Sequence, residues 1–284
     1  MSPSVLLVTV AFNSSSVMND FLKSIEVGTS HEHEVVVVDN ASSDLDTLRE
    51  IVARHPSVRL HELAQNHGYG GGMNAGVKFA GSSSDYILVA NPDVSFLPGS
   101  IDTLIDSAEH TPSGGAFGPA ILNADGTLYP SARELPSLRT GIGHALFGRA
   151  WPENPWTRGY RVPVSAADGQ RHAGWLSGAC VLIRTGAFEQ LSGFDTSYFM
   201  YFEDVDLGER LTAHGWSNVY LPEAQVMHSG AHSTSQSPTS MGQAHHDSAY
   251  RYLSRRYSGP HLALLRGVLR LGLYLRRRWL TRKH

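Results

Sequence analysis

The sequence has little cysteine, no long apolar run and no acidic residue in its last 37 positions. Its 284 residues include one cysteine, Cys180, which excludes an internal disulfide framework and predicts a reducing compartment. No stretch of eighteen or more residues is both apolar and free of charge, so we expect no transmembrane helix. The short apolar run at 4–12 follows no basic residues, and we interpret it as a strand rather than a signal peptide.

Charge is distributed unevenly along the chain. All 26 acidic residues lie at or before Asp247, whereas ten of the 23 Lys and Arg residues follow it. The net charge of −3 therefore combines −13 over residues 1–247 (13 basic against 26 acidic) with +10 over residues 248–284. A basic segment joined to an acidic body predicts an anionic partner surface for that segment.

The first half alternates strand-like and helix-like segments. Near-continuous Val, Leu and Ile runs, typical of parallel strands covered on both faces, occupy residues 4–12, 34–42, 58–63 and 85–91. Helix-length segments lie between them at 15–27, 44–55, 70–80 and 99–110. This order predicts an α/β fold with an open, doubly wound, mostly parallel sheet flanked by helices.

The alternation of strand-like and helix-like segments ends after residue 111. We expect a strand at 114–122, an irregular region at 123–172, a strand entering a short helix at 174–194, a helix at 202–215, and one or two short strands at 217–229. Residues 230–243 are polar, and we expect them to be mobile. The remainder of the chain is expected to be helical.

Polar residues fall where the expected strands end. Asn13, Asp39 and Asp93 lie at the carboxyl ends, the edge at which open α/β sheets bind ligands. Asp39 suits a pyrimidine N–H or a ribose hydroxyl, although capping the turn in "DNASSD" is an equal alternative. The glycine-dense "NHGYGGGMNAG" at 66–76 permits close approach to phosphates or a sugar, and a flexible loop is its alternative.

Asn91-Pro92-Asp93 stands where many sugar-transferring enzymes carry Asp-x-Asp to hold a metal. Here Asn91 replaces the first acid, so one carboxylate would be left to bind the cation together with substrate phosphates. His228, at the end of a short strand, is a candidate second ligand because imidazole suits manganese. The chain has 15 histidines, and a structural or exposed role for His228 is the alternative.

Three acids open the helix expected at 202–215. Glu203, Asp204 and Asp206 are favoured there by the helix dipole alone. The functional interpretation is that one of them is the general base for an inverting displacement, in which an acceptor hydroxyl expels a nucleotide diphosphate from a sugar. The aromatic residues just before them could form a sugar platform, raise a carboxylate pKa by burial, or belong to the core.

Taken together, these segments resemble the inverting family 2 glycosyltransferases, which have the GT-A fold. The resemblance covers residues 4–230 and rests on "VTVAFN", "VVVVDNAS", "NHGYGGGMNAG", "NPDV", "WLSGACVLIR", "GFDTSYFMYFEDVDL" and a following His. Within the family, "YPSAR" and "WPENPW" look most like the actinobacterial rhamnosyltransferases. These enzymes transfer L-rhamnose from dTDP-L-rhamnose to N-acetylglucosaminyl-diphosphoryl-decaprenol through an α-1,3 link.

The resemblance implies roles for particular residues. It implies Asp204 as catalytic base, Asp93 and His228 as ligands of Mg²⁺ or Mn²⁺, and Glu203 near the acceptor. The implied nucleotide-sugar contacts are Thr9, Ala11, Asn13, Asp39, Gly70, Asn74, Asn91 and Asp93. The implied acceptor contacts are Trp175, Leu176, Ser177 and Gly178.

The same resemblance suggests a division of the chain. We expect a GT-A domain over 1–230, with a nucleotide-sugar half to about residue 122 and an acceptor half from 123, then a flexible loop over 231–247 and a helical tail over 248–284. The expected partners are dTDP-L-rhamnose and a polyprenyl-diphosphate-linked GlcNAc. Open alternatives are another rhamnosyl- or galactofuranosyltransferase, a non-catalytic nucleotide-sugar-binding or scaffold protein, and a nucleotide-binding dehydrogenase.

The tail has the pattern of an amphipathic, basic, interfacial helix. On a helical wheel its apolar side carries Leu264, Leu265, Val268, Leu269, Leu271, Leu275 and Trp279, with Arg266, Arg270 and Arg277 opposite. We expect it to bind an anionic membrane surface, which predicts a cytoplasmic protein peripheral on the inner face of the cell membrane. Packing on the domain or a homodimer interface are the alternatives, and no nucleic-acid recognition motif is present.

Overall fold

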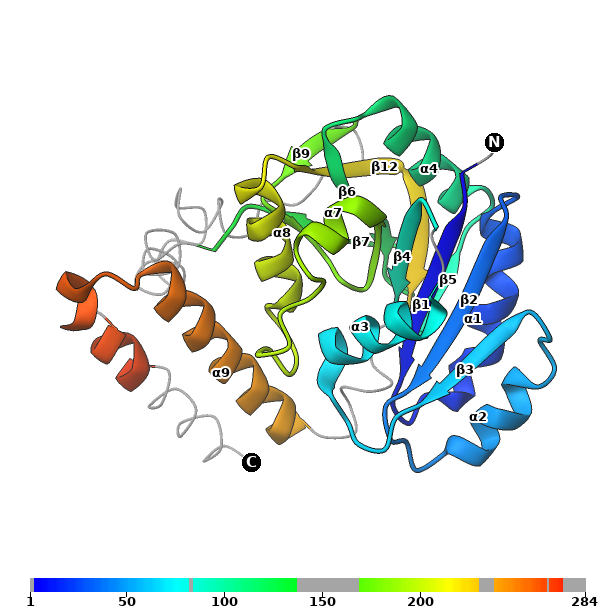
Figure 1. The fold of residues 1–284 in the computed structure, drawn as a ribbon, viewed down its shortest axis with the longest axis horizontal. Coiled ribbons are helices and arrows are strands. Elements are labelled where there is room, and N and C mark those ends of the chain that lie inside the picture. The colour runs from blue at the N-terminus through cyan, green and yellow to red at the C-terminus, as the bar shows by residue number, and fades with distance from the viewer. Residues whose placement is uncertain (1–2, 82–83, 137–168, 230–237, 265, 273–284) are drawn as a thin grey trace.

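One central sheet organises the computed structural model, which describes residues 3–81, 84–136, 169–229, 238–264 and 266–272 (Figure 1). Four strands run parallel in the spatial order β3-β2-β1-β4. They are β1 (Val5–Ala11), β2 (His33–Asp39), β3 (Val58–Glu62) and β4 (Tyr86–Ala90). The open, mostly parallel sheet expected from the sequence is thereby confirmed.

Beyond β4 the sheet becomes mixed. β11 (Cys180–Arg184) runs antiparallel to both β4 and β6 (Gly114–Leu122), and β12 (Ser217–His228) then runs parallel to β6. β5 (Val94–Phe96) closes the order as an antiparallel edge strand on β12. Two short strands extend this half, β7 (Leu128–Tyr129) on β6 and β9 (Arg171–Ala173) on β12, whereas β8 (Ala132–Arg133) and β10 (Trp175–Leu176) pair in a separate two-stranded sheet.

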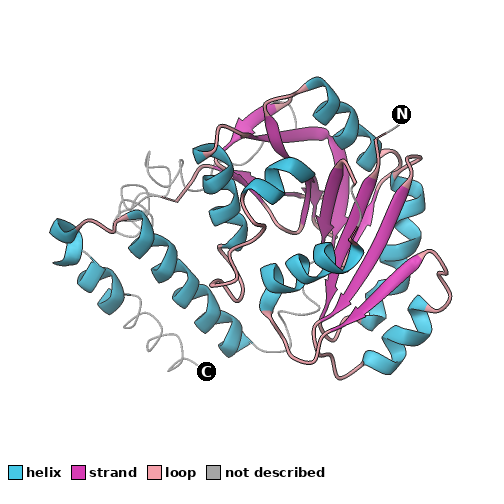
Figure 2. Ribbon diagram, in the orientation of Figure 1, coloured by secondary structure: helices cyan, strands magenta, loops and turns pink. Residues whose placement is uncertain are grey.

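Helices cover both faces of the sheet (Figure 2). One face packs against α1 (Ser15–Gly28), α2 (Leu45–Val52) and α4 (Ser100–His110). The other packs against α3 (Gly68–Ala80), α7 (Thr185–Gln190) and α8 (Glu203–Ala213). Successive side chains of β1 point to opposite faces of the sheet, so both faces are apolar. Val5 and Leu7 pack in the hydrophobic core on the first face, whereas Leu6 and Val8 pack in the core on the second.

The segment predicted as one or two short strands is a single strand, β12, with an irregularity. Its pairing with β6 shifts register between Leu221 and Gln225. Pro222 lies inside this shift and has no N–H to donate to the neighbouring strand, which accounts for the local break. The strand then continues to His228 and carries that residue to the edge next to β5.

The C-terminal region begins differently from the prediction. Helix α9 (Pro238–Arg256) starts ten positions before the expected boundary at 248 and packs beside α8 (Figure 1). A 3-10 turn, η2 (Pro260–Leu262), and helical residues 263–264 and 266–272 follow. Within the described part of the chain, no helix is both long and apolar enough to cross a membrane. Residues 231–237 of the expected loop, and Leu265, Leu275, Arg277 and Trp279 of the expected amphipathic helix, lie outside the described residues.

Candidate active site

Asp39 lies at the carboxyl end of β2 and has no exposed surface. Its Oδ2 accepts hydrogen bonds from the backbone N–H groups of Ala41 (3.1 Å) and Ser42 (3.2 Å), so the turn-capping alternative is part of its role. Its Oδ1 is buried and has no hydrogen-bond partner among the described residues. A buried acceptor of this kind is costly unless a donor reaches it, and an N–H of a bound ligand would satisfy it.

Three residues of β1 and its exit were expected to line the nucleotide pocket. Thr9 and Ala11 are fully buried in the strand, and the Thr9 hydroxyl is a second buried group without a hydrogen-bond partner in the described part of the chain. Asn13 adopts a left-handed backbone (φ 52°), and its Oδ1 accepts hydrogen bonds from the N–H (2.8 Å) and hydroxyl (2.9 Å) of Ser43. Asn13 therefore ties the end of β1 to the loop after β2.

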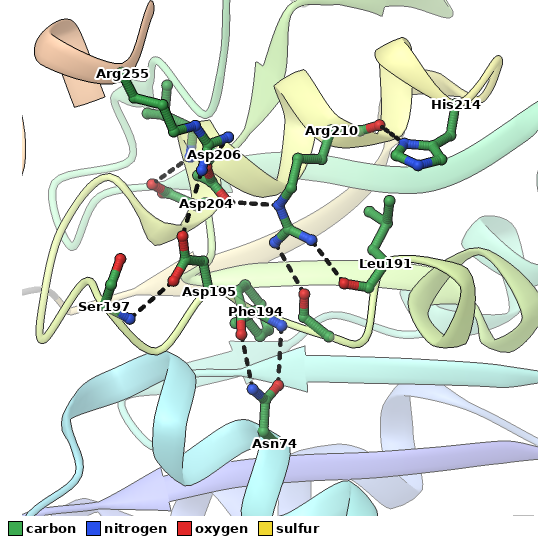
Figure 3. Close-up of polar contacts among 12 residues, drawn as sticks. Asn74, Leu191, Phe194, Asp195, Ser197, Asp204, Asp206, Arg210, His214 and Arg255 are labelled. Carbon is green, nitrogen blue, oxygen red and sulfur yellow. Dashed lines mark hydrogen bonds and ion pairs between the residues drawn. The ribbon is translucent and has the colours of Figure 1, made fainter. Parts of the chain in front are cut away.

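The glycine-rich start of α3 has a packing role that differs from the phosphate or sugar contact expected. A Cβ on Gly70 would lie 2.8 Å from the Cβ of Phe194, and one on Gly76 would lie 2.5 Å from Val8. Asn74 donates to the carbonyl of Phe194 (2.8 Å) and accepts from its N–H (3.0 Å), as Figure 3 shows. Gly70 and Asn74 therefore hold the loop around Phe194, and their nucleotide-sugar contact stays a prediction.

Asp93 and His228 meet across the edge of the sheet. The pairing of β5 with β12 places His228 opposite Val94, and His228 Nε2 lies 3.0 Å from Asp93 Oδ1. Asn91 Nδ2 lies 3.3 Å from the same ring nitrogen. Side-chain exposures of 12% for Asp93 and 18% for His228 leave the pair accessible.

The donor set of this pair fits a divalent cation. A carboxylate oxygen and an imidazole nitrogen suit Mn²⁺, and Mg²⁺ takes oxygen ligands while usually keeping positions for substrate phosphates. The described residues contain no cluster of three or more His, Cys, Asp or Glu side chains arranged for a metal. Substrate oxygens or water would therefore supply the rest of the coordination shell.

Asp204 occupies the first turn of α8 and is fixed by the backbone around it. Its Oδ1 accepts a hydrogen bond from the N–H of Val205 (2.9 Å), and its Oδ2 accepts one from the N–H of Gly178 (3.2 Å). The hydroxyl of Tyr69 donates to the carbonyl of Gly178. Segments from α3, the turn after β10 and α8 therefore converge on this carboxylate.

Two adjacent carboxyl groups lie at this point, and burial raises the pKa of both. For Glu203, which is 6% exposed, the Asp204 charge adds to the effect of burial and places the pKa well above its ordinary value. For Asp204, the hydrogen bonds from Gly178 and Val205 oppose the effect of burial on its pKa. Glu203 Oε2 has no hydrogen-bond partner among the described residues. The ionised form is therefore better supported at Asp204 than at Glu203.

The expected acceptor residues differ in their exposure. Leu176, Ser177 and Gly178 are buried, and Leu176 packs against Gly118. Trp175 is partly exposed, and its indole N–H donates to the carbonyl of Glu134 (3.1 Å). Trp175 is thus the only one of these four with appreciable surface for a ligand.

The sequence assigned no site role to Arg133 or Tyr69. The Arg133 guanidinium lies 5.6 Å from the centre of the Trp175 ring, and its charge lowers the pKa of Asp204 against the effect of burial. The pairing of β8 with β10 places Arg133 beside Trp175. The "YPSAR" segment that contains Arg133 contributed to the family resemblance, but nothing in its local pattern indicated where the arginine would lie.

The site can be compared with those of known proteins by sequence. The family model described as glycosyltransferase-like family 2 matches residues 3–244. The chain is 45% identical over 285 aligned positions to the N-acetylglucosaminyl-diphospho-decaprenol L-rhamnosyltransferase of Mycobacterium tuberculosis, covering 97% of this chain and 92% of the relative. It is 25% identical to the rhamnosyltransferase WbbL of Escherichia coli, over 89% of this chain and 93% of the relative.

Solved structures agree with the fold. A mannosyltransferase from Pyrobaculum calidifontis in complex with GDP-mannose and Mn²⁺ superposes with a TM-score of 0.61 at 14% identity, covering 98% of this chain and 72% of that chain. This likeness supports the GT-A fold expected from the sequence. Together with the match over most of the chain and the relative at 45% identity, it shows that the chain is a glycosyltransferase and belongs to glycosyltransferase family 2.

Proposed function

We propose that this enzyme transfers L-rhamnose to the N-acetylglucosamine of a polyprenyl-diphosphate carrier, as a step in making a cell-wall linker. The observation that carries the proposal is the 45% identity, over nearly the full length of both chains, to the mycobacterial L-rhamnosyltransferase. The arrangement around Asp204 supports it, because a buried carboxylate held by backbone N–H groups suits the one general base of an inverting transferase.

The proposed donor is dTDP-L-rhamnose. Asp39 Oδ1, which has no hydrogen-bond partner among the described residues, would accept a hydrogen bond from the N–H of a pyrimidine such as thymine. At the same edge of the sheet, Asp93 follows the end of β4, and His228 is the last residue of β12. The diphosphate of the donor would extend from Asp39 toward this pair.

In the proposed reaction Asp204 is the base. The acceptor hydroxyl gives its proton to an Asp204 carboxylate oxygen while its oxygen forms a bond to the anomeric carbon, and the bond from that carbon to the dTDP oxygen breaks. Hydrogen bonds from Gly178 and Val205 fix the orientation of the carboxylate. The raised pKa of Asp204 makes it a better proton acceptor than an exposed aspartate. Trp175 and Arg133 border the acceptor side.

We propose Asp93 and His228 as the ligands of Mg²⁺ or Mn²⁺, with Asn91 beside them. Two structural neighbours, the Pyrobaculum mannosyltransferase and GalNAc-T7, were solved with Mn²⁺. A bound cation would neutralise charge on the leaving diphosphate. The residues of this chain hold the cation and orient the diphosphate against it.

We also propose that residues 260–272 bind the cytoplasmic face of the membrane. Leu264, Val268 and Leu271 are 81%, 61% and 57% exposed, an unusual degree for apolar side chains on a helix. Two of the ten basic residues of 248–284, Arg255 and Arg256, pair with acids of α8. The membrane attraction is therefore assigned to the basic residues that follow α9, each contributing about 1 kcal/mol when close to an anionic leaflet.

The test is incubation of the full chain with a panel of nucleotide sugars and a short-chain polyprenyl-diphosphate-GlcNAc, followed by mass measurement of the product. A deoxyhexose added only from dTDP-L-rhamnose is expected. Addition of a hexose from a galactofuranose or other donor, with no product from dTDP-L-rhamnose, would replace the proposed donor.

A further inference from the structure

Two consecutive non-glycine residues immediately before α8, the helix that carries the proposed base, have left-handed backbones. Tyr201 has φ 66° and Phe202 has φ 68°, and α8 begins at the next residue, Glu203. Left-handed geometry is unfavourable for residues with bulky side chains, and it persists only where surrounding contacts hold it. The position of Asp204 therefore depends on whatever restrains this pair.

Helix α9 supplies contacts to this strained pair. The Ser248 hydroxyl donates to the carbonyl of Met200 (2.8 Å). The ring of His245 lies 5.4 Å from that of Tyr201 and 5.6 Å from that of Phe202, centre to centre. Tyr252 is only 1% exposed, and the centre of its ring lies 5.6 Å from that of Phe202. It packs in one hydrophobic cluster with Val205 of α8.

A buried ion-pair network holds the residues after the base. The carboxylate of Asp206 has no exposed surface, and it lies 2.6 Å from Arg210 on its own helix and 2.6 Å from Arg255 of α9. Arg255 also reaches Asp195 at 3.3 Å (Figure 3). Without Arg255, a buried negative charge would keep only one of its two cationic partners.

Arg210 links the same network to the loop that precedes α8. Its guanidinium donates to the carbonyls of Leu191 (3.0 Å) and Gly193 (2.9 Å), next to the Phe194 backbone held by Asn74 (Figure 3). A disturbance at Asp206 would therefore reach both the first turn of α8 and the loop over α3.

We propose that α9 is a part of the catalytic apparatus, and that Arg255 and Ser248 are positioning residues for Asp204. Ser248 holds the segment just before the base and Arg255 holds the residue two positions after it, so the carboxylate is restrained from both sides. This inference rests on the proposed function, in which Asp204 is the base. It gives the start of the basic segment a role that is independent of any membrane.

The decisive substitution is Arg255→Ala, assayed with a water-soluble acceptor so that membrane binding does not contribute. We expect kcat to fall about tenfold, because small displacements of a reacting group cost one to two orders of magnitude in rate. The dissociation constant for dTDP should stay within about twofold of wild type, since Asp39 and Asp93 lie elsewhere. Arg255→Lys should recover part of kcat by restoring a positive charge beside Asp206.

Arg256→Ala is the matched control. Arg256 is the next residue of α9 and also pairs with α8, but its acidic partner is Glu209, five positions beyond Asp204 (2.6 Å), and its other contact is the hydroxyl of Tyr252 on its own helix (2.9 Å). The Arg256→Ala substitution should lower the thermal unfolding midpoint about as much as Arg255→Ala does. Its kcat should stay within about twofold of wild type. Equal losses of kcat in the two variants would show that α9 contributes stability alone, and would overturn the inference.

Two further variants keep the result interpretable. If Arg255→Ala does not fold, Ser248→Ala, which removes one hydroxyl, decides the question: kcat about threefold lower supports the inference, and wild-type kcat overturns it. Asp204→Asn is measured in parallel. If it is inactive while Arg255→Ala matches wild type, the inference fails and the proposed base stands. If Asp204→Asn keeps its turnover, the base assignment fails, and the positioning role with it.

Discussion

The two sides of the active site are built in different ways. Around the proposed nucleotide pocket at Asp39, polar contacts join residues close in sequence, such as Asn13 with Ser43 and Asn40 with Asn66, 30 and 26 positions apart. On the side of the proposed base, Tyr69 and Gly178 are 109 positions apart, and Asn74 and Phe194 are 120 apart. The nucleotide pocket follows from neighbouring βα units, whereas the base side, like the contact of Asn91 with His228 137 positions away, exists only when distant segments meet.

This difference makes substitutions on the two sides distinguishable. A change at Asp39 should alter nucleotide affinity, because Asp39 is the proposed hydrogen-bond acceptor for the nucleobase. Changes around Asp204 should alter turnover while nucleotide affinity is kept. The following predictions test this separation, from the largest expected effect to the smallest.

Asp204→Asn should lower kcat by about 10²–10⁴-fold, the usual contribution of a general base. The dissociation constant for dTDP, measured by calorimetry, should change less than about twofold. Near-wild-type turnover would exclude Asp204 as the base and direct attention to Glu203 and Asp206.

Asp93→Ala and His228→Ala should each lower activity by about 10–100-fold in limiting Mg²⁺ or Mn²⁺, with partial recovery at higher metal concentration. Manganese binding to the protein with dTDP, followed by electron paramagnetic resonance, provides a readout that does not depend on turnover. Full activity of the wild type in excess chelator would contradict the metal assignment for both residues.

Asp39→Ala should weaken dTDP binding by about tenfold or more, because it removes the hydrogen-bond acceptor proposed for the thymine N–H. Leaving such a buried group without its partner typically costs about 1–3 kcal/mol. At saturating donor, kcat should remain within about threefold of wild type. A large loss of kcat at saturation would break the distinction between the two sides.

Truncation after Gly259 keeps α9 and removes the exposed apolar residues Leu264, Val268 and Leu271. Binding to anionic vesicles should fall at least about tenfold, and wild-type binding should weaken with added salt because the Debye length is about 8 Å at physiological ionic strength. Turnover on a water-soluble acceptor should change less than about twofold. Vesicle binding that survives both truncation and salt would reject the membrane proposal.

Glu203→Gln should change the pH dependence of stability more than the rate. Since burial and Asp204 raise the folded-state pKa of Glu203, the folded protein holds this proton more tightly than the unfolded chain. The contribution of Glu203 to the free energy of unfolding of the wild type is therefore fully present below about pH 4.3. It is lost as the pH rises through the folded-state pKa. Thermal scans from pH 5 to 8 should show the variant gaining stability over wild type as pH rises. A constant difference would contradict the raised pKa.

Local patterns were sufficient to predict part of this molecule. Apolar runs gave β1 to β4 and β6, and the acids at strand and helix ends gave Asp39, Asp93 and Asp204 as candidates. These features depend on the spacing of apolar residues and on turn-forming Pro, Gly and Asn residues. Both signals are contained within a single segment of the chain. The antiparallel insertion of β11 between β4 and β6 was not predicted, because strand order is set by packing between distant segments.

Partners of individual side chains were harder to predict. The glycines of α3 indicated ligand contact from sequence, yet Gly70 and Gly76 allow close packing on Phe194 and Val8. Arg255 and Arg256 were counted with the membrane-binding charges, yet they pair with acids of α8. In both cases the sequence shows which residue is present, but the contacts of that residue are determined by tertiary packing.

The place of β12 in the sheet has a consequence for the order in which the enzyme matures during synthesis. This strand lies between β6 and β5, so the short β5 has no partner on that side until residues 217–228 have been made. The β1–β4 unit that presents Asp39 is complete more than a hundred residues earlier. A nascent chain would therefore acquire its proposed nucleotide pocket first, its Asp93–His228 pair later, and the support for its base last, when α9 has left the ribosome.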